Sequence, residues 1–402
     1  MSPSSLRVAN RLKSIKVSPI LALSQRAREL RAAGRDIIDL TVGEPDFDTP
    51  EEIKVAAKAA IDRGETKYTA LNGAPALLEA ITERLADRGM WGRGRAVIAC
   101  SGAKQVVREI LDFNPQLKDL ALGEVRNLSI TPKGAKAPIG YGLYLPAGYK
   151  AGERYPVVIQ THGWDPKSFQ MAGESSAGYA AQILAGKGFV VVQCGESPTF
   201  TNPAEGPDNM ALFEAILDEL DRQGLIDTSR IGIQAWSRTG VAVRWTLVHS
   251  KYRFAAALLV DSMTVNYMEY LTAEGIRASY QDTLEAINGG SPIGRAGLQT
   301  WAKTAPAFNF DDLHTAVKIF AFQPLGLSEP WEDYVVLKHL GKPVELTFLP
   351  DSNHWPLRPA ERMTVQDGAV DWWAYWLKGE KDPDPAKADE YRRWDALRAK
   401  SG

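Results

Sequence analysis

Ser237 is the residue of this sequence best suited to nucleophilic chemistry. It lies in RIGIQAWSRTG, residues 230–240, where an apolar strand is expected to turn into a helix. A serine hydroxyl attacks a carbonyl once a neighbouring base takes its proton, and a sharp strand-to-helix turn exposes the hydroxyl for that step. Such a turn favours small residues two positions on either side of the serine. Ala235 is small, but the β-branched Thr239 should crowd the first helical turn, and Gly240 would relieve part of that crowding. A serine that opens a helix is also a common N-cap.

His354 is the candidate base. It lies in LPDSNHWP, residues 349–356, directly after an apolar strand and late in the chain. The other four histidines, at 162, 249, 314 and 339, are interpreted as structural or exposed. His162 stands out among them because THGW, residues 161–164, also follows an apolar strand.

The elements around these residues alternate between short apolar strands and helices. Strands are predicted in 189–195, 230–236, 254–262, 316–324 and 342–350, and helices in 210–224, 239–250 and 368–379. This alternation predicts a mostly parallel sheet covered by helices on both faces. The N-terminal part differs, because 18–34, 50–64 and 73–89 all read as helices with glycine stops. The order serine, acid, histidine on such a sheet is that of an α/β-hydrolase.

Composition excludes several classes of function. The 402 residues are 45% hydrophobic and 24% charged, with a formal net charge of -2, which gives no reason to expect a nucleic-acid or anionic-membrane partner. Cys100 and Cys194 are the only cysteines, and no HExxH-like pair occurs, so we expect no metal site. No apolar run approaches the ~20 residues that span a bilayer, and the N-terminus lacks the apolar core of a secretory signal. We therefore expect a cytoplasmic protein.

Residues 1–107 resemble the N-terminal quarter of a fold-type I aminotransferase of the aspartate aminotransferase class. The matching motifs are GEPDFDTP (43–50), TKYTALNGAPALLEAI (66–81) and SGAKQ (101–105). The resemblance implies part of a pyridoxal phosphate site, but the family's Schiff-base lysine and its partners come later in the chain. Ser250–Lys251 lacks the arginine motif that should follow. We interpret residues 1–107 as a truncated segment joined to a second domain over 108–402.

Residues 110–393 resemble the catalytic domain of prolyl oligopeptidase-family serine hydrolases. The motifs are YLPAGYKAGERYPVVIQTHGW, GLIDTSRIGIQAWSRTG, LGKPVELTFLPDSNHW and the closing VDWWAYWLKGEKDPDPAKADEYRRW. The resemblance implies an α/β-hydrolase fold with Ser237 as nucleophile and His354 as base, and no cofactor. It also implies an oxyanion hole made by the backbone N–H of Arg238 and one from the Gly163–Trp164 loop. Thr161 stands about where many members carry a tyrosine, and it is too short to replace that hydroxyl.

The acid of the triad is open between several carboxylates. The family places it after the strand matching AVKIFAFQP, where this chain reads LGLSEPWEDY. We favour Glu329, followed by Glu332 and Asp333. Asp261, at the end of FAAALLVD, is the further alternative.

The function expected from these residues is hydrolysis of a peptide or small ester substrate through an acyl-enzyme. Two alternatives stay open. The first is a pyridoxal phosphate-dependent aminotransferase whose activity depends on residues 1–107. The second is a non-catalytic relic of a hydrolase. This alternative is suggested by Thr161, Thr239 and the uncertain identity of the acid.

Overall fold

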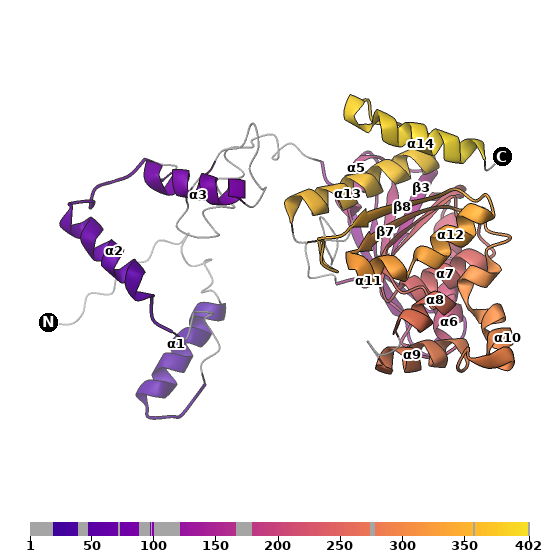
Figure 1. The fold of residues 1–402 in the computed structure, drawn as a ribbon, viewed down its shortest axis with the longest axis horizontal. Coiled ribbons are helices and arrows are strands. Elements are labelled where there is room, and N and C mark those ends of the chain that lie inside the picture. The colour runs from indigo at the N-terminus through magenta and orange to yellow at the C-terminus, as the bar shows by residue number, and fades with distance from the viewer. Residues whose placement is uncertain are drawn as a thin grey trace. The chain divides into compact units, whose positions relative to one another are not determined.

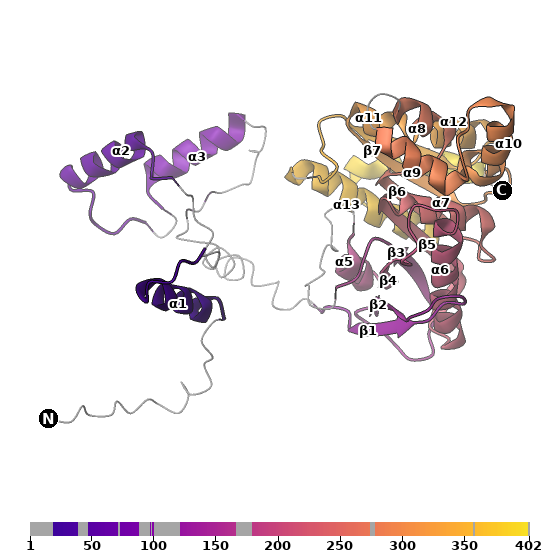
Figure 2. The same ribbon diagram turned by 90° about the horizontal axis from the view of Figure 1, so that it is seen from below.

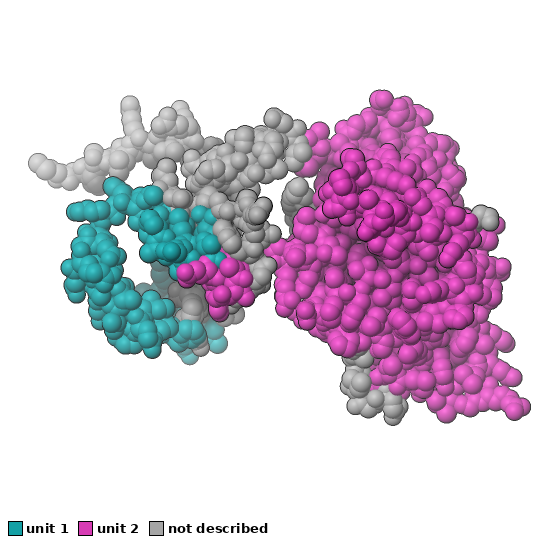
Figure 3. All heavy atoms as spheres, turned by 45° about the horizontal axis from the view of Figure 1, so that its top comes forward, with its two compact units in different colours: residues 1–82, 96–100 teal, residues 83–95, 101–402 magenta. Residues whose placement is uncertain are grey.

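The computed structural model describes residues 19–38, 47–70, 73–87, 97, 99, 121–165, 179–273, 278–356 and 358–400. The chain divides into two compact units, one of residues 1–82 and 96–100 and the other of residues 83–95 and 101–402 (Figure 3). The boundary predicted between residues 107 and 108 lies outside the described residues and stays a prediction.

The N-terminal part of the chain is helical where it is described, as predicted. Its helices are α1 Pro19–Ala32, α2 Glu51–Asp62 and α3 Pro75–Asp87 (Figure 1). None of the residues of α2 and α3 is buried. Packing therefore contributes little to these two helices, although it supplies most of the stability of helices in globular proteins.

The second unit is built on a mixed sheet with the order β1-β2-β4-β3-β5-β6-β7-β8. β1 and β2 run antiparallel to their neighbours, and all pairs from β4 through β3 to β8 are parallel. The strands are β1 Val125–Ile130, β2 Ile139–Tyr144, β3 Tyr155–Gln160, β4 Val190–Cys194, β5 Ile226–Ser237, β6 Ala256–Ser262, β7 Ala316–Phe322 and β8 Val344–Leu349. This arrangement confirms the predicted α/β-hydrolase sheet.

Helices cover both faces of this sheet (Figures 1 and 2). The helices of this unit are α5 Ala181–Gly186, α6 Glu205–Arg222, α7 Gly240–His249, α8 Tyr267–Ala273, α9 Ala278–Asn288, α10 Gly294–Thr304, α11 Gln323–Ser328, α12 Trp331–His339, α13 Pro359–Trp373 and α14 Ala388–Ala399. Shorter helical turns are η3 Pro306–Asn309, η4 Ala374–Lys378 and η5 Pro385–Lys387. No helix among the described residues has both the length and the apolar character needed to cross a bilayer.

Successive residues of each central strand enter different cores, because side chains alternate across a sheet. In β3, Val157 and Ile159 pack with α6 and α7, whereas Val158 packs with α5 and α13. All three are fully buried. A sheet buried on both faces requires continuous apolar strands, and this is the pattern by which the sequence predicted them. The sheet thus becomes a rigid support for the loops at the carboxyl ends of its strands.

Candidate active site

Ser237 occupies a tight turn between β5 and α7. Its φ of 54° lies in the left-handed region that non-glycine residues rarely adopt. Such strain concentrates at functional sites, where the surrounding structure holds it in place. Here the Ser237 carbonyl accepts a 3.0 Å hydrogen bond from Met263 N, which fixes the turn against the loop after β6.

The close approach at this turn falls on Gly240 rather than on Thr239. A Cβ at Gly240 would lie 2.2 Å from the Met263 carbonyl oxygen and 2.9 Å from Ser262 Cβ. The Thr239 side chain is buried, and its hydroxyl is hydrogen bonded within the turn. Ala235 is fully buried, as a small flanking residue should be.

His354 reaches Ser237 and binds Asp261 with its other nitrogen. His354 Nε2 lies 2.9 Å from Ser237 Oγ, and His354 Nδ1 lies 2.5 Å from Asp261 Oδ2. The second oxygen of Asp261 accepts a hydrogen bond from Phe322 N at 3.2 Å. Asp261 is only 11% exposed in its side chain, whereas His354 is 44% exposed. The buried carboxylate therefore orients a histidine that stays accessible to substrate.

Asp261, and not the favoured Glu329, is the carboxylate that the structure places against His354 Nδ1. Asp261 is the penultimate residue of β6, and β6 pairs directly with β5, which carries Ser237. The loop expected to carry the acid starts instead with helix α11, immediately after β7. Glu329 lines the same cavity as Ser237 but lies at the far end of this helical turn.

The other two candidates are engaged elsewhere in a buried network. Asp333 Oδ2 accepts a 2.6 Å hydrogen bond from Arg244 Nε, and both side chains are almost completely buried. Glu332 accepts a 2.6 Å hydrogen bond from Met268 N. Arg244 also donates to the Met263 carbonyl at 2.7 Å, so the network supports the loop that follows Asp261.

Burial raises the pKa of Glu332, and the nearby charges of Asp333 and Glu269 raise it further. A carboxyl group whose pKa is higher in the folded than in the unfolded protein stabilises the fold while it is protonated. This contribution is complete below the unfolded-state pKa, about 4.3, and is lost as the pH rises through the folded-state pKa. The Glu332→Gln side chain cannot ionise, so this variant does not lose that stability as the pH rises. We expect the variant to gain unfolding free energy over the wild type as pH rises above about 4.3, by up to about 1.4 kcal/mol per pH unit within that window. Urea unfolding at pH 5 and pH 8 measures it.

Glu380→Gln is the matched control for this prediction, since Glu380 is half-exposed and lies outside the network. A difference between Glu332→Gln and the wild type that is the same at both pH values would contradict the prediction.

Gly163 and Trp164, the two predicted oxyanion donors in the loop after β3, differ in their contacts. The Gly163 N–H already donates to the Cys194 carbonyl at 3.0 Å, so it is not available to a substrate oxygen. Trp164 is anchored on the sheet edge, where its indole Nε1 donates to Asn127 Oδ1 at 2.9 Å. A Cβ at Gly142 would lie 2.5 Å from this indole, so the glycine makes room for it.

Arg238, which follows the nucleophile, supplies the other candidate donor through its backbone N–H. Its side chain points to the start of α6, where Nη2 lies 2.6 Å from Glu205 Oε2. Glu205 is buried and also accepts a hydrogen bond from Thr201 N at 2.7 Å. The ion pair therefore ties the nucleophile turn to the loop that precedes α6.

Trp236 supports the histidine, a role that the sequence did not predict. Its ring stacks on His354 with centroids 4.8 Å apart, and it lies 4.6 Å from the His162 ring. Its Nε1 donates to the His354 carbonyl at 3.3 Å. Because Trp236 immediately precedes Ser237, one buried side chain couples the positions of nucleophile and base.

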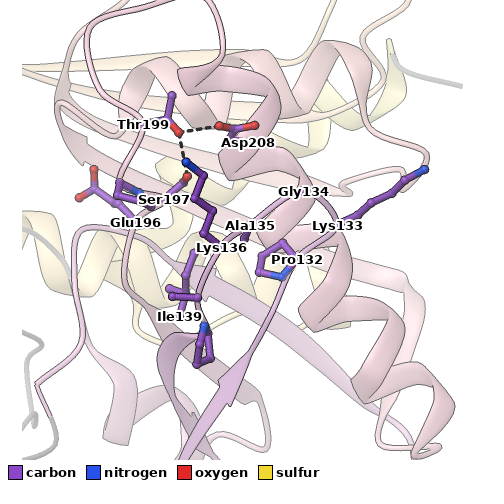
Figure 4. Close-up of a pocket in the computed structure, with 13 residues that line it drawn as sticks. Pro132, Lys133, Gly134, Ala135, Lys136, Ile139, Glu196, Ser197, Thr199 and Asp208 are labelled. Carbon is purple, nitrogen blue, oxygen red and sulfur yellow. Dashed lines mark hydrogen bonds between the residues drawn. The ribbon is translucent and has the colours of Figure 1, made fainter.

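A cavity of about 260 Å³ opens at Ser237, Asp261 and His354. Its wall also includes Met263 and Tyr280. A larger cavity, of about 600 Å³, lies between residues 132–139 and 196–199, with Asp208 at its side (Figure 4). None of the hydrogen-bonded Ser–His–Asp residues lines that larger cavity. Within the described part of the chain, no cluster of three or more His, Cys, Asp or Glu could hold a metal ion.

Comparisons with known proteins support a composite chain. Residues 204–380 match the model of the prolyl oligopeptidase family, and residues 35–114 match that of aminotransferase class I and II. The lasso peptide isopeptidase AtxE2 of Asticcacaulis excentricus is 29% identical over 318 residues, which cover 72% of this chain and 43% of that protein. The aspartate/prephenate aminotransferase of Cereibacter sphaeroides is 47% identical over 105 residues, 26% of each chain. The chain thus spans less than half the length of these curated relatives.

Solved structures agree with the fold. AtxE2 isopeptidase with Astexin3-dC4 bound superposes with a TM-score of 0.62 at 27% identity, covering 72% of this chain and 45% of that chain. The Pyrococcus horikoshii acylaminoacyl peptidase gives a TM-score of 0.53 at 18% identity, over 68% of this chain and 45% of that one. The second likeness concerns the fold alone.

Proposed function

We propose that this chain is a serine peptidase that cleaves peptide bonds through an acyl-enzyme, since residues 204–380 match the model of the prolyl oligopeptidase family. The observation that carries the proposal is the continuous hydrogen-bonded chain from Ser237 through His354 to Asp261. A hydroxyl, an imidazole and a buried carboxylate in this order are the groups that acyl transfer requires.

In the first half of the reaction Ser237 Oγ attacks the substrate carbonyl while His354 Nε2 takes its proton. Asp261 holds the imidazole in the required tautomer and stabilises the imidazolium that forms. The backbone N–H groups of Arg238 and Trp164 bind the oxyanion of the tetrahedral intermediate. His354 then gives its proton to the leaving amine, which departs and leaves an ester on Ser237.

In the second half a water molecule attacks this ester, again with His354 as base. The proton returns to Ser237 Oγ and the carboxylic acid product leaves. Every proton is carried by His354, so the cycle needs no cofactor.

The substrate proposed is a peptide, with small esters as artificial substrates. An isopeptide bond is a second candidate, favoured by the 29% identity to a protein named as a lasso peptide isopeptidase. We assign no activity to residues 35–114, which match about a quarter of the length of aminotransferases. The cytoplasmic location expected from the sequence stays a prediction.

A burst experiment tests the proposal. With p-nitrophenyl acetate we expect a rapid release of one equivalent of p-nitrophenol per enzyme, followed by slower turnover, since an acyl-enzyme must form before it is hydrolysed. Linear and isopeptide-linked peptides, analysed by mass spectrometry, then identify the bond that is cleaved. Folded protein that gives neither burst nor cleavage would overturn the proposal.

A further inference from the structure

Thr161 and Thr239, the two residues that depart from the family pattern at this site, contact each other. Thr161 Oγ1 lies 2.7 Å from Thr239 Oγ1. The residues are 1% and 2% exposed, so this contact is closed to solvent. Thr161 directly follows β3 and Thr239 directly precedes α7, so a single hydroxyl pair joins two separate loops of the active site.

Thr239 is also fixed within its own turn, and Thr161 is also fixed to the neighbouring strand β5. Thr239 Oγ1 accepts from Trp236 N at 3.1 Å and donates to the Trp236 carbonyl at 2.8 Å, so it closes the turn that carries Ser237. Thr161 N donates to the Gln234 carbonyl at 3.2 Å, and Thr161 Oγ1 lies 2.9 Å from the same oxygen. Movement of either loop would therefore break several buried hydrogen bonds, and each unsatisfied buried group costs about 1–3 kcal/mol.

These two loops carry the two N–H donors assigned to the oxyanion hole. Arg238 lies between Ser237 and Thr239, and Trp164 lies three positions after Thr161. The backbone between Thr161 and Trp164 passes through left-handed conformations, with φ of 83° at His162 and 114° at Gly163. The direction of each N–H therefore depends on how its turn is anchored at the threonine.

We infer that the Thr161–Thr239 hydroxyl pair positions the two loops and so sets the distance between the two oxyanion donors; this inference rests on the proposed function. Thr161 stands where many family members carry a tyrosine, and Thr239 stands where a small residue is expected. Thr161 does not reach the substrate oxygen but holds, through Thr239, the turn from which the Arg238 N–H points.

A purely structural role and a positioning role predict different kinetics. The net contribution of one neutral hydrogen bond to stability is about 1 kcal/mol. A donor displaced from the developing oxyanion costs about 10–100-fold in rate, because the stabilisation is made only in the transition state. The pair should therefore act on kcat and leave KM nearly unchanged.

The test compares Thr161→Val, Thr239→Val and the double variant, which keep the side-chain shape and lose the hydroxyls. Thr161→Ser and Thr239→Ser keep the hydroxyls. The control is Thr246→Val, a fully buried threonine of α7 whose hydroxyl bonds only within its own helix, to the Ala242 carbonyl. For each protein we would measure kcat and KM on a p-nitrophenyl ester, the rate of phosphonylation by a fluorophosphonate, and the melting temperature.

We expect each Val variant to lose about 10–100-fold in kcat and in phosphonylation rate, with KM within about threefold. The double variant should lose no more than the worse single variant, because both act on one contact. The Ser variants and Thr246→Val should stay within about threefold of the wild type. If Thr239→Val does not fold, the kinetics of Thr161→Ala test the inference instead, because this variant keeps both hydrogen bonds between Thr239 Oγ1 and the Trp236 backbone.

Three results would overturn the inference: Val variants with wild-type kcat, an equal loss in Thr246→Val, or losses that multiply in the double variant. Failure of the proposed function would be visible earlier, because the wild-type protein itself would then neither turn over the ester nor react with the fluorophosphonate.

Discussion

Ser237→Ala is expected to lower kcat by about 10⁵–10⁶-fold while KM changes little, because the variant lacks the atom that forms the acyl-enzyme. The residual rate would come from substrate binding and the oxyanion donors, which the substitution leaves in place. Steady-state hydrolysis of a p-nitrophenyl ester measures the effect. The burst of p-nitrophenol should vanish completely.

The fold of this variant has to be compared with that of a matched serine variant. Ser229→Ala lies in the same strand, at an exposed position remote from His354, and should keep wild-type kcat. A Ser237→Ala protein that unfolds at the wild-type temperature but retains more than about a hundredth of kcat would refute Ser237 as the nucleophile.

Asp261→Asn is expected to lower kcat by about 10⁴-fold. An asparagine presents an N–H where the carboxylate accepts one, so the imidazole is favoured in the tautomer that cannot take the Ser237 proton. The heavy-atom geometry is retained, so the effect should lie in kcat rather than in stability. The measurement is ester hydrolysis, with circular dichroism to verify the fold.

Glu329→Gln is the informative comparison, since Glu329 lines the same cavity and is the acid that the sequence favoured. It should cost at most about tenfold, because His354 Nδ1 is already bound to Asp261. A larger loss of kcat in Glu329→Gln than in Asp261→Asn would indicate that the triad acid is Glu329, in the segment after β7.

The fold was largely predictable because its central strands are buried on both faces and read as continuous apolar runs. The same pattern placed Ser237 at the end of β5 and His354 after β8, both correctly located at the carboxyl edge of the sheet. Chain order alone indicated which serine and which histidine meet.

The acid was not predictable in the same way, because it depends on where a helix begins. Glu329 and Glu332 come after the strand β7, and Asp261 lies at the end of the apolar run of β6, so the sequence offers carboxylates near the ends of two neighbouring strands. Two features of the three-dimensional structure distinguish them: α11 starts directly after Phe322, and Asp261 lies near the end of the strand adjacent to β5.

The threonines and Gly163 illustrate a second limit. The sequence indicated that Thr239 is too bulky for its position. A residue-by-residue comparison with a family pattern does not reveal that the Thr239 hydroxyl contacts the Thr161 hydroxyl. Likewise Gly163 and Trp164 are adjacent in the sequence, and only the hydrogen bond from Gly163 N to the Cys194 carbonyl distinguishes them as donors.

The most direct test of the triad is to identify the residue that a fluorophosphonate modifies. Purified protein would be reacted with the probe, digested, and analysed by tandem mass spectrometry. We predict a single adduct on Ser237, absent from heat-unfolded protein, because only the folded site brings His354 to within 2.9 Å of the hydroxyl. An adduct on another residue, or none on folded protein, would contradict the assignment of Ser237 as the nucleophile.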